Sequence, residues 1–231
     1  MSRYRHLFFD LDHTLWDFRA NSRATLRELH GELGLAEAGV ELADEFIATY
    51  EEVNAGLWRR YESGHIEKAV LRVLRFRNTL LRFGVRNDRL STMLGQLYIE
   101  RCPRRTALSP GARELIEEVH PDHRIHIITN GFTEVQRVKV DASGLAPYVD
   151  VLLTSEDAGA GKPDARIFEL AMRRAGASVQ ESLMVGDSIG NDMEGARRVG
   201  MDHAHYVEEG DPDPLADLRF THFDELRSFL R

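Results

Sequence analysis

The chain has 231 residues, of which 42% are hydrophobic and 29% charged; this composition is typical of a folded globular protein and excludes disordered, collagen-like and coiled-coil classes. Acidic residues outnumber basic ones by 38 to 30, and the formal net charge of −8 argues against a protein that holds nucleic-acid backbones. A single cysteine excludes an intrachain disulfide and a thiolate zinc site. No apolar stretch approaches the ~18–20 residues of a membrane-spanning helix.

The first strand is predicted at residues 6–10. Its acid at Asp10 comes too early for a signal peptide. We therefore expect a cytoplasmic protein that binds neither a nucleic-acid polymer nor a membrane, while the sequence leaves monomer and dimer equally open.

A block at residues 16–104 follows, with strong helical periodicity and no convincing strand. Apolar residues recur at helical spacing in three stretches of it: Leu42, Phe46, Ile47, Tyr50, Val53 and Leu57; Ile66, Ala69, Val70, Val73 and Leu74; and Leu90, Leu94, Leu97 and Tyr98. The pattern predicts an all-helical insertion after the first strand.

Strands and helices then alternate, which is typical of an α/β fold with a largely parallel sheet. Ser109-Pro110 is predicted to open a helix, and Thr133-Glu134-Val135-Gln136 has the spacing of a capping box. Further helices are predicted up to Gly144, around Ile167, Leu170 and Ala171 up to Gly176, and at 191–199 before Gly200. Strands are predicted at 125–129, 149–153, 183–186 and 203–207. The expected fold class is α/β, a Rossmann-like parallel sheet core (1–15 and 105–231) carrying an inserted all-helical cap (16–104).

Reactive residues follow several of the predicted strands. They stand in the segments Asp10-Leu11-Asp12-His13-Thr14, Thr129-Asn130-Gly131, Lys162-Pro163 and Gly186-Asp187 with Asp192. Taken alone, Asp10 fits a turn or a helix cap better than a catalytic role, Thr129-Asn130-Gly131 fits a common turn, and Lys162 fits a solvated loop lysine. Ligands of open parallel sheets bind beyond the carboxyl ends of the strands, so the segments together predict one site at that edge.

The residue types suit phosphoryl transfer to a carboxylate. A phosphate carries roughly −1.5 to −2 charges, so a site rich in aspartates needs a divalent cation and a fixed positive side chain. Asp10 and Asp187 offer oxygen ligands suited to Mg²⁺, and Lys162 supplies the ammonium. Thr129 and the amides after it suit phosphate oxygens, and Asp12 suits proton transfer to the leaving oxygen and from water.

These segments resemble, in order, the four motifs of the haloacid dehalogenase superfamily, and the insertion resembles the cap of its C1 subgroup. The resemblance implies that Asp10 is the nucleophile and that Asp12 is the acid/base, with its main-chain carbonyl also on the metal. It further implies a phosphate site at Thr129, Asn130 and Lys162, and a Mg²⁺ site (with Mn²⁺ as the alternative ion) at Asp10, Asp12, Asp187 and Asp192. An acid at Asp12 disfavours the dehalogenases, whose halide leaving group needs no proton.

Two longer stretches, 54–64 and 127–144, are similar to bacterial nucleotidases of the superfamily that act on pyrimidine nucleoside monophosphates. This implies hydrolysis of small phosphomonoesters such as UMP, dUMP or dTMP. Trp58 and Tyr61 either pack within the cap or contact the base. The alternatives are a phosphatase or mutase acting on a sugar phosphate or phosphoglycolate, a phosphorylated receiver, and a non-catalytic phosphate-binding regulator.

Other patterns are interpreted without a function. Gly159-Ala160-Gly161-Lys162 lacks the first glycine and the final Ser or Thr of a P-loop. His203 and His205 share one side of a predicted strand, and without a third ligand we interpret them as core or surface residues rather than metal ligands. Asp211-Pro212-Asp213-Pro214 is interpreted as an acidic turn.

Overall fold

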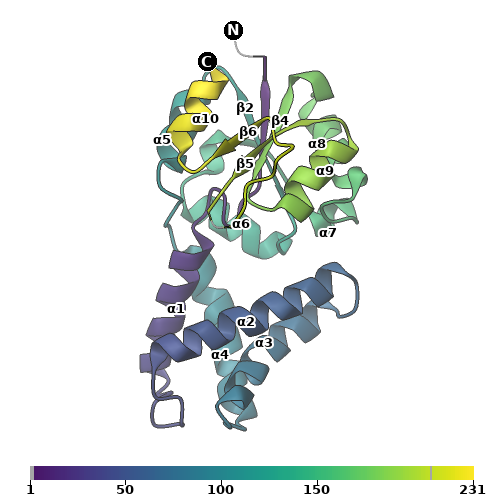
Figure 1. Ribbon diagram of the computed structural model, residues 1–231. Coiled ribbons are helices and arrows are strands. Elements are labelled where there is room, and N and C mark those ends of the chain that lie inside the picture. Colours follow the sequence, from purple (N-terminus) through teal and green to yellow (C-terminus); the bar gives the residue numbers. More distant parts are fainter. Residues whose placement is uncertain (1–2, 209) are drawn as a thin grey trace. The chain divides into compact units, whose positions relative to one another are not determined.

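The computed structural model describes residues 3–208 and 210–231. The chain forms two compact units, one containing the residues up to Phe18 together with Arg105–Arg231, and the other Arg19–Arg104. The first holds the sheet and the second is helical (Figure 1). Within the described ranges, no helix is long and apolar enough to cross a membrane.

Among the residues that the structure describes, the sheet has six strands, all parallel, in the order β3-β2-β1-β4-β5-β6. The strands are β1 His6–Phe9, β2 Arg124–Thr129, β3 Val149–Thr154, β4 Ser182–Gly186, β5 Asp202–Tyr206 and β6 Leu218–Phe220. The predicted α/β class and all five predicted strands are confirmed. The sequence prediction missed β6, which has only three residues, one of them a charged Arg219, and so shows little periodicity.

Helices cover both faces of the sheet. Helices α8 (Ala165–Ala175) and α9 (Glu194–Arg198) lie on one side, and α5 (Ala112–Val119) and α10 (Phe223–Leu230) on the other (Figure 1). The α8 side buries Phe168 against Phe8, Ile128 and Met184 of three neighbouring strands. Full burial of such a side chain contributes about 1.5–3 kcal/mol. This core holds the strand ends rigidly in register.

In the described part of the sheet unit, the other helical segments are α6 (Thr133–Ala142), α7 (Ser155–Ala158), short 3₁₀ turns at Ala146–Tyr148 and Val179–Glu181, and a π-helical turn at Ile189–Met193. As predicted, Gly144, Gly176 and Gly200 end helical segments with positive φ. The helix predicted to open at Ser109-Pro110 begins at Ala112 instead, after Gly111 with φ 83°.

The predicted capping box at Thr133 is wrong. The N-cap of α6 is Phe132, which makes no side-chain cap hydrogen bond. The side chain of Gln136 instead reaches Asp12 and Thr129, because tertiary partners are available that the local spacing does not reveal.

The helical unit contains most of α1 (Phe18–Glu32), together with α2 (Ala43–Glu62), α3 (Lys68–Arg82), α4 (Asp88–Arg101) and a 3₁₀ turn at Cys102–Arg104. Rings from three helices meet in its core, with Tyr50 lying 4.9 Å from Phe76 and 5.4 Å from Tyr98. Most residues of the predicted apolar faces of α2 and α4 are buried. Val53 and Leu97 are only partly buried, and Leu42, which precedes α2, is 57% exposed.

The predicted face of α3 is wrong. Val70 and Val73 are 40% and 61% exposed, whereas Leu71, Phe76 and Leu80 are buried. Helix α3 carries two adjacent apolar stripes, and its packing between α2 and α4 selects the one with the larger side chains.

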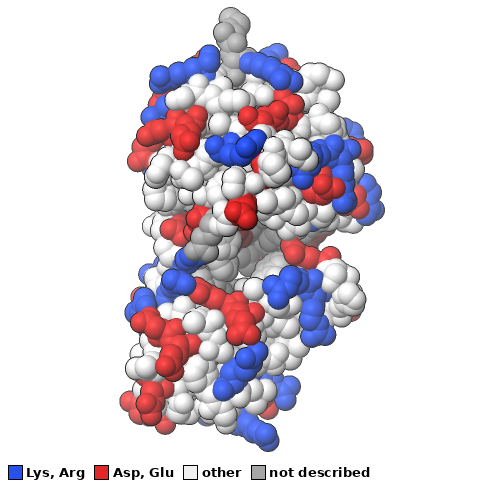
Figure 2. Space-filling model, in the orientation of Figure 1, with Lys and Arg blue, Asp and Glu red and all other residues white. Residues whose placement is uncertain are grey.

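Acidic and basic side chains are interspersed over the face of the molecule drawn in Figure 2.

Candidate active site

Four charged side chains meet beyond the carboxyl ends of β1 and β4. Asp10 follows β1 directly, and Asp187 follows β4. The Lys162 ammonium lies 2.6 Å from Asp10 Oδ1 and 2.6 Å from Asp192 Oδ1. One carboxylate oxygen from each of the three aspartates lies within 4.8 Å of the others. The strand ends thus bring together four residues predicted for the site.

The charges of this cluster do not balance, since three carboxylates surround one ammonium. Burial raises the pKa of Asp10 above its ordinary value; Asp192 and Asp187 raise it further, against the lowering effect of Lys162. Burial, together with Asp192, also raises the pKa of Asp187 to about 6. A bound divalent cation would compensate the excess negative charge, so the donor set fits a metal such as Mg²⁺.

Asp192 reaches the cluster through a π-helical turn, Ile189–Met193, which continues into α9. The turn brings its carboxylate back over the end of β4, where Oδ2 accepts the N–H of Ser188 at 3.0 Å. A Cβ on Gly186 would lie only 2.3 Å from that oxygen. The glycine in Gly186-Asp187 is therefore required by the close approach of Asp192. Single π turns of this kind often occur at functional sites.

Asp12 has different surroundings from the other three aspartates. Its Oδ1 pairs with the ammonium of Lys139, and its Oδ2 accepts a hydrogen bond from Gln136 at 2.9 Å. The Lys139 side chain is almost fully buried, and its ammonium lies 4.4 Å from the ring centre of Trp16. Asp12 is thus held by α6 rather than by the acidic cluster.

The sequence prediction missed Gln136 and Lys139. They stand three residues apart in the helix after β2 and so share a face. That spacing, next to a predicted catalytic strand end, is the sequence signal for a pair of site residues, but the same Gln136 also fits the capping-box pattern that begins at Thr133.

The segment after β2 holds the predicted phosphate residues. Thr129 Oγ1 accepts hydrogen bonds from the N–H of Gly131 at 3.1 Å and from Gln136 at 2.6 Å. The side-chain amide of Asn130 bonds to the main chain of Lys162 twice, accepting from its N–H at 2.8 Å and donating to its carbonyl at 3.0 Å. Asn130 therefore fixes the loop that carries Lys162.

The loop after β1 adds two residues that the sequence prediction did not assign. Thr14 donates its hydroxyl to Asp187 Oδ1 at 3.0 Å, which orients that carboxylate. His13 has φ 68°, a left-handed conformation that is uncommon outside glycine. Its ring lies 3.5 Å from the Glu208 carboxylate. Burial lowers the pKa of His13, but Glu208, Asp187 and Asp12 outweigh it and the net shift is upward.

Trp58 and Tyr61 belong to α2 of the helical unit. Both are partly buried, and their rings contact each other edge to face, with centres 5.6 Å apart and planes at 88°. This contact agrees with mutual packing at the spacing of three.

Comparisons with known proteins place this arrangement in a family. Residues 4–200 match the family model described as haloacid dehalogenase-like hydrolase. The chain is 33% identical to the pyrimidine 5′-nucleotidase PynA of Streptococcus pneumoniae over 205 residues, covering 88% of this chain and 84% of that protein. It is likewise 33% identical to the pyrimidine 5′-nucleotidase YjjG of Escherichia coli over 215 residues, covering 91% and 90%.

A solved structure shares the whole fold. The crystal structure of the putative HAD-hydrolase YfnB of Bacillus subtilis, bound to magnesium, covers 99% of both chains with a TM-score of 0.87 and 29% identity. The chain belongs to the haloacid dehalogenase-like hydrolases, as the motifs predicted. Within that family it is an enzyme of the phosphomonoester hydrolase class.

Proposed function

We propose that this phosphomonoester hydrolase uses Asp10 as its nucleophile and acts on pyrimidine nucleoside monophosphates of the UMP, dUMP and dTMP type. The observation that carries the chemistry is the cluster of Asp10, Asp187 and Asp192, in which the buried Lys162 pairs with Asp10 and Asp192. Asp12 is held apart from this cluster. Similarity over most of the chain to two proteins named pyrimidine 5′-nucleotidases supports the substrate.

The proposed reaction has two steps. An Asp10 oxygen attacks phosphorus, the bond from phosphorus to the ester oxygen breaks, and Asp12 gives that oxygen a proton. Asp12 then takes a proton from water, whose oxygen attacks the phosphorus of the aspartyl-phosphate; inorganic phosphate leaves and the Asp10 carboxylate is restored. Lys139 and Gln136 act as positioning residues because they hold both oxygens of Asp12.

The phosphate is proposed to lie between Lys162 and Thr129. The Lys162 ammonium would neutralise phosphate oxygens at the cluster. Thr129 Oγ1 already accepts two hydrogen bonds, so its own O–H is directed to a further acceptor. The Asn130 side chain bonds to the Lys162 main chain, so a phosphate contact from Asn130 would use its main-chain N–H.

Asp10, Asp187 and Asp192 would hold Mg²⁺, or Mn²⁺ in its place, together with the main-chain carbonyl of Asp12. The ion would supply positive charge where phosphate oxygens become more negative in the transition state. Thr14 would keep Asp187 turned toward the ion.

A phosphate-release assay with Mg²⁺ tests the proposal on UMP, dUMP, dTMP, AMP, a hexose phosphate and phosphoglycolate. Release concentrated on the pyrimidine nucleotides and abolished by Asp10→Asn is the expected result. Release from the sugar phosphate or phosphoglycolate alone would retain the Asp10 mechanism and overturn the substrate. Full activity of Asp10→Asn would overturn the mechanism.

We assign substrate selection to a cap formed by residues 16–104, with Trp58 or Tyr61 contacting the base. Stacking of a base on an aromatic ring contributes about 1–3 kcal/mol. Trp58→Ala should therefore raise KM for UMP at least fivefold and leave KM for p-nitrophenyl phosphate within twofold. Equal losses on both substrates would assign Trp58 to packing alone.

A further inference from the structure

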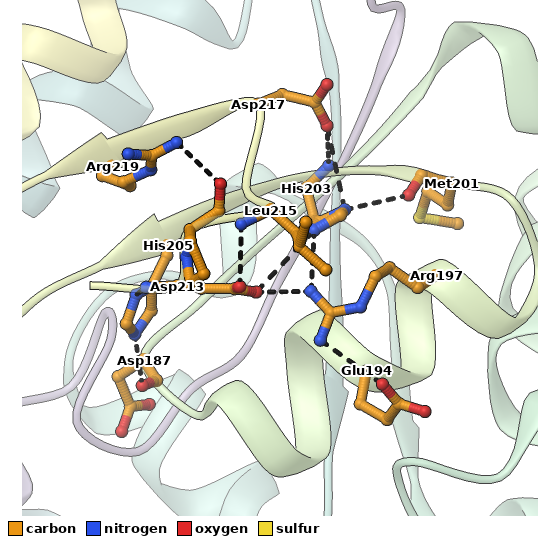
Figure 3. Close-up of polar contacts among 11 residues, drawn as sticks. Asp187, Glu194, Arg197, Met201, His203, His205, Asp213, Leu215, Asp217 and Arg219 are labelled. Atoms are coloured by element: carbon orange, nitrogen blue, oxygen red, sulfur yellow. Dashed lines mark hydrogen bonds and ion pairs between the residues drawn. The ribbon is translucent and has the colours of Figure 1, made fainter. Parts of the chain in front are cut away.

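The predicted acidic turn contains a buried carboxylate. Asp213 is only 2% exposed, although it stands in a loop between β5 and β6. Its Oδ2 pairs with Arg197 of α9, and its Oδ1 accepts the N–H of Leu215 at 3.0 Å (Figure 3). Arg197 in turn lies 3.3 Å from Glu194 on the same helix. The loop at Asp213 is thus anchored to α9 by an ion pair whose carboxylate is buried and whose guanidinium is partly exposed.

His205 of β5 links this loop to the candidate active site. Its Nδ1 accepts the main-chain N–H of Asp213 at 3.0 Å, so the ring proton must be on Nε2. That Nε2–H donates to the main-chain carbonyl of Asp187 at 2.9 Å. The ring is 3% exposed and lies between Asp213 and Asp187 (Figure 3).

Asp187 is consequently held at two points. Thr14 fixes one carboxylate oxygen, and His205 fixes the peptide that carries the side chain. We propose that His205 is a positioning residue for Asp187 as a metal ligand, and that the main chain at the buried Asp213 sets the orientation of His205. This rests on the metal-binding role given to Asp187 under the proposed function. Groups that orient metal ligands change metal affinity by about 10–100-fold when they are removed.

Two substitutions at His205 separate its two hydrogen bonds. His205→Asn keeps an acceptor where Nδ1 stands, for the Asp213 N–H, but has no donor that reaches Asp187. His205→Gln places an amide N–H where Nε2 stands and restores the donor. His203→Asn is the matched control, because His203 is similarly buried on the same strand but bonds to the Met201 carbonyl rather than to that of Asp187. Its ring also lies beside Arg197 and 3.9 Å from the Asp213 carboxylate, so this variant tests a disturbance of the same loop without loss of the hydrogen bond to Asp187.

The measurement is a titration of the metal-free proteins with Mn²⁺, with free Mn²⁺ followed by electron paramagnetic resonance. We expect Kd to rise about tenfold in His205→Asn and to stay within threefold of wild type in His205→Gln and His203→Asn. Wild-type affinity in His205→Asn, or an equal loss in His203→Asn, overturns the inference. If the wild-type protein binds no Mn²⁺, both the metal site and the inference about His205 are overturned. The phosphate-release assay with the substrate panel does not depend on His205, so it tests the proposed function separately.

A second measurement uses the wild-type protein alone, so its result does not depend on whether a variant folds. Imidazole ¹⁵N NMR of the wild-type protein should show His205 as the Nε2–H tautomer, with its Nε2 resonance shifted by saturating Mg²⁺. The other tautomer, or a resonance that Mg²⁺ leaves unmoved, overturns the proposal.

Discussion

Replacing Gly186 by alanine tests how Asp192 enters the site. The new Cβ would lie 2.3 Å from Asp192 Oδ2, 2.5 Å from its Cγ and 2.7 Å from its Cβ. The aspartate has little freedom to retreat, since it is fully buried and its oxygens contact Ser188 and Lys162. Gly186→Ala must therefore displace Asp192 from both partners.

The expected cost combines two effects. Overpacking a well-packed site costs about 1–3 kcal/mol, and disrupting a buried ion pair costs about 3–5 kcal/mol when a partner is removed entirely. Asp192 is displaced rather than removed, and Lys162 keeps its contact with Asp10. We therefore expect Gly186→Ala to lower the free energy of unfolding by about 3 kcal/mol, and to weaken Mn²⁺ binding at least tenfold.

Urea unfolding of the metal-free proteins at a single pH measures the first effect, and the Mn²⁺ titration measures the second. Gly190→Ala is the matched control, because Gly190 stands four residues later, in the π-helical turn that carries Asp192, and its Cβ would meet nothing within 4 Å. The free energy of unfolding of Gly190→Ala is expected to differ from that of wild type by at most about 1 kcal/mol. An error on the order of 0.5 kcal/mol is expected for the free energy of unfolding. If the free energies of unfolding of Gly186→Ala and wild type differ by no more than this, the close approach of Asp192 to Gly186 does not constrain the site, and the reasoning is refuted.

Three further outcomes are expected. Asp12→Ala leaves the Lys139 ammonium buried without its partner, so urea unfolding should show a loss of about 3 kcal/mol, largely recovered when Lys139→Met is added; additive losses would contradict the pairing. Burial, followed by the neighbouring His6, lowers the pKa of His126 from 6.5 to about 4. The unfolded chain therefore takes up the proton first, and stability should fall by about 3 kcal/mol as the pH drops from about 6.5 to 4; an unchanged pH profile in His126→Leu would refute this. Mg²⁺ at 100 times its Kd should raise the free energy of unfolding by about 2.7 kcal/mol, and EDTA should reverse this; equal melting curves with and without Mg²⁺ would argue against the metal site.

Local patterns explain why so much of the fold was predictable. The strands before Asp10 and Asp187 are short apolar runs followed by acids, and both features lie within a few residues of each other. The parallel arrangement then brings their carboxyl ends to one edge, so Asp10, Asp187 and Lys162 were expected together and are found together.

The choice between two apolar stripes was not local. On α3, apolar residues occur on two neighbouring faces, one with Val70 and Val73 and the other with Leu71 and Phe76, and packing against α2 and α4 decides which face is buried. In the same way, Thr133 and Gln136 have the spacing of a capping box, but their side chains hydrogen-bond to Thr154 and Thr129, at the ends of β3 and β2.

By itself, the sequence determined the α/β class, the strand ends and the acids, threonine and lysine at them, because these depend on neighbours along the chain. Only the tertiary structure decided what holds them in place. Lys139 meets Asp12 across 127 positions of sequence, and His205 joins Asp213 to Asp187 from a strand that neither belongs to. The physical reason is that a buried polar group needs a hydrogen-bond partner. In the packed core that partner can come from a distant part of the sequence, so local spacing along the chain does not identify it.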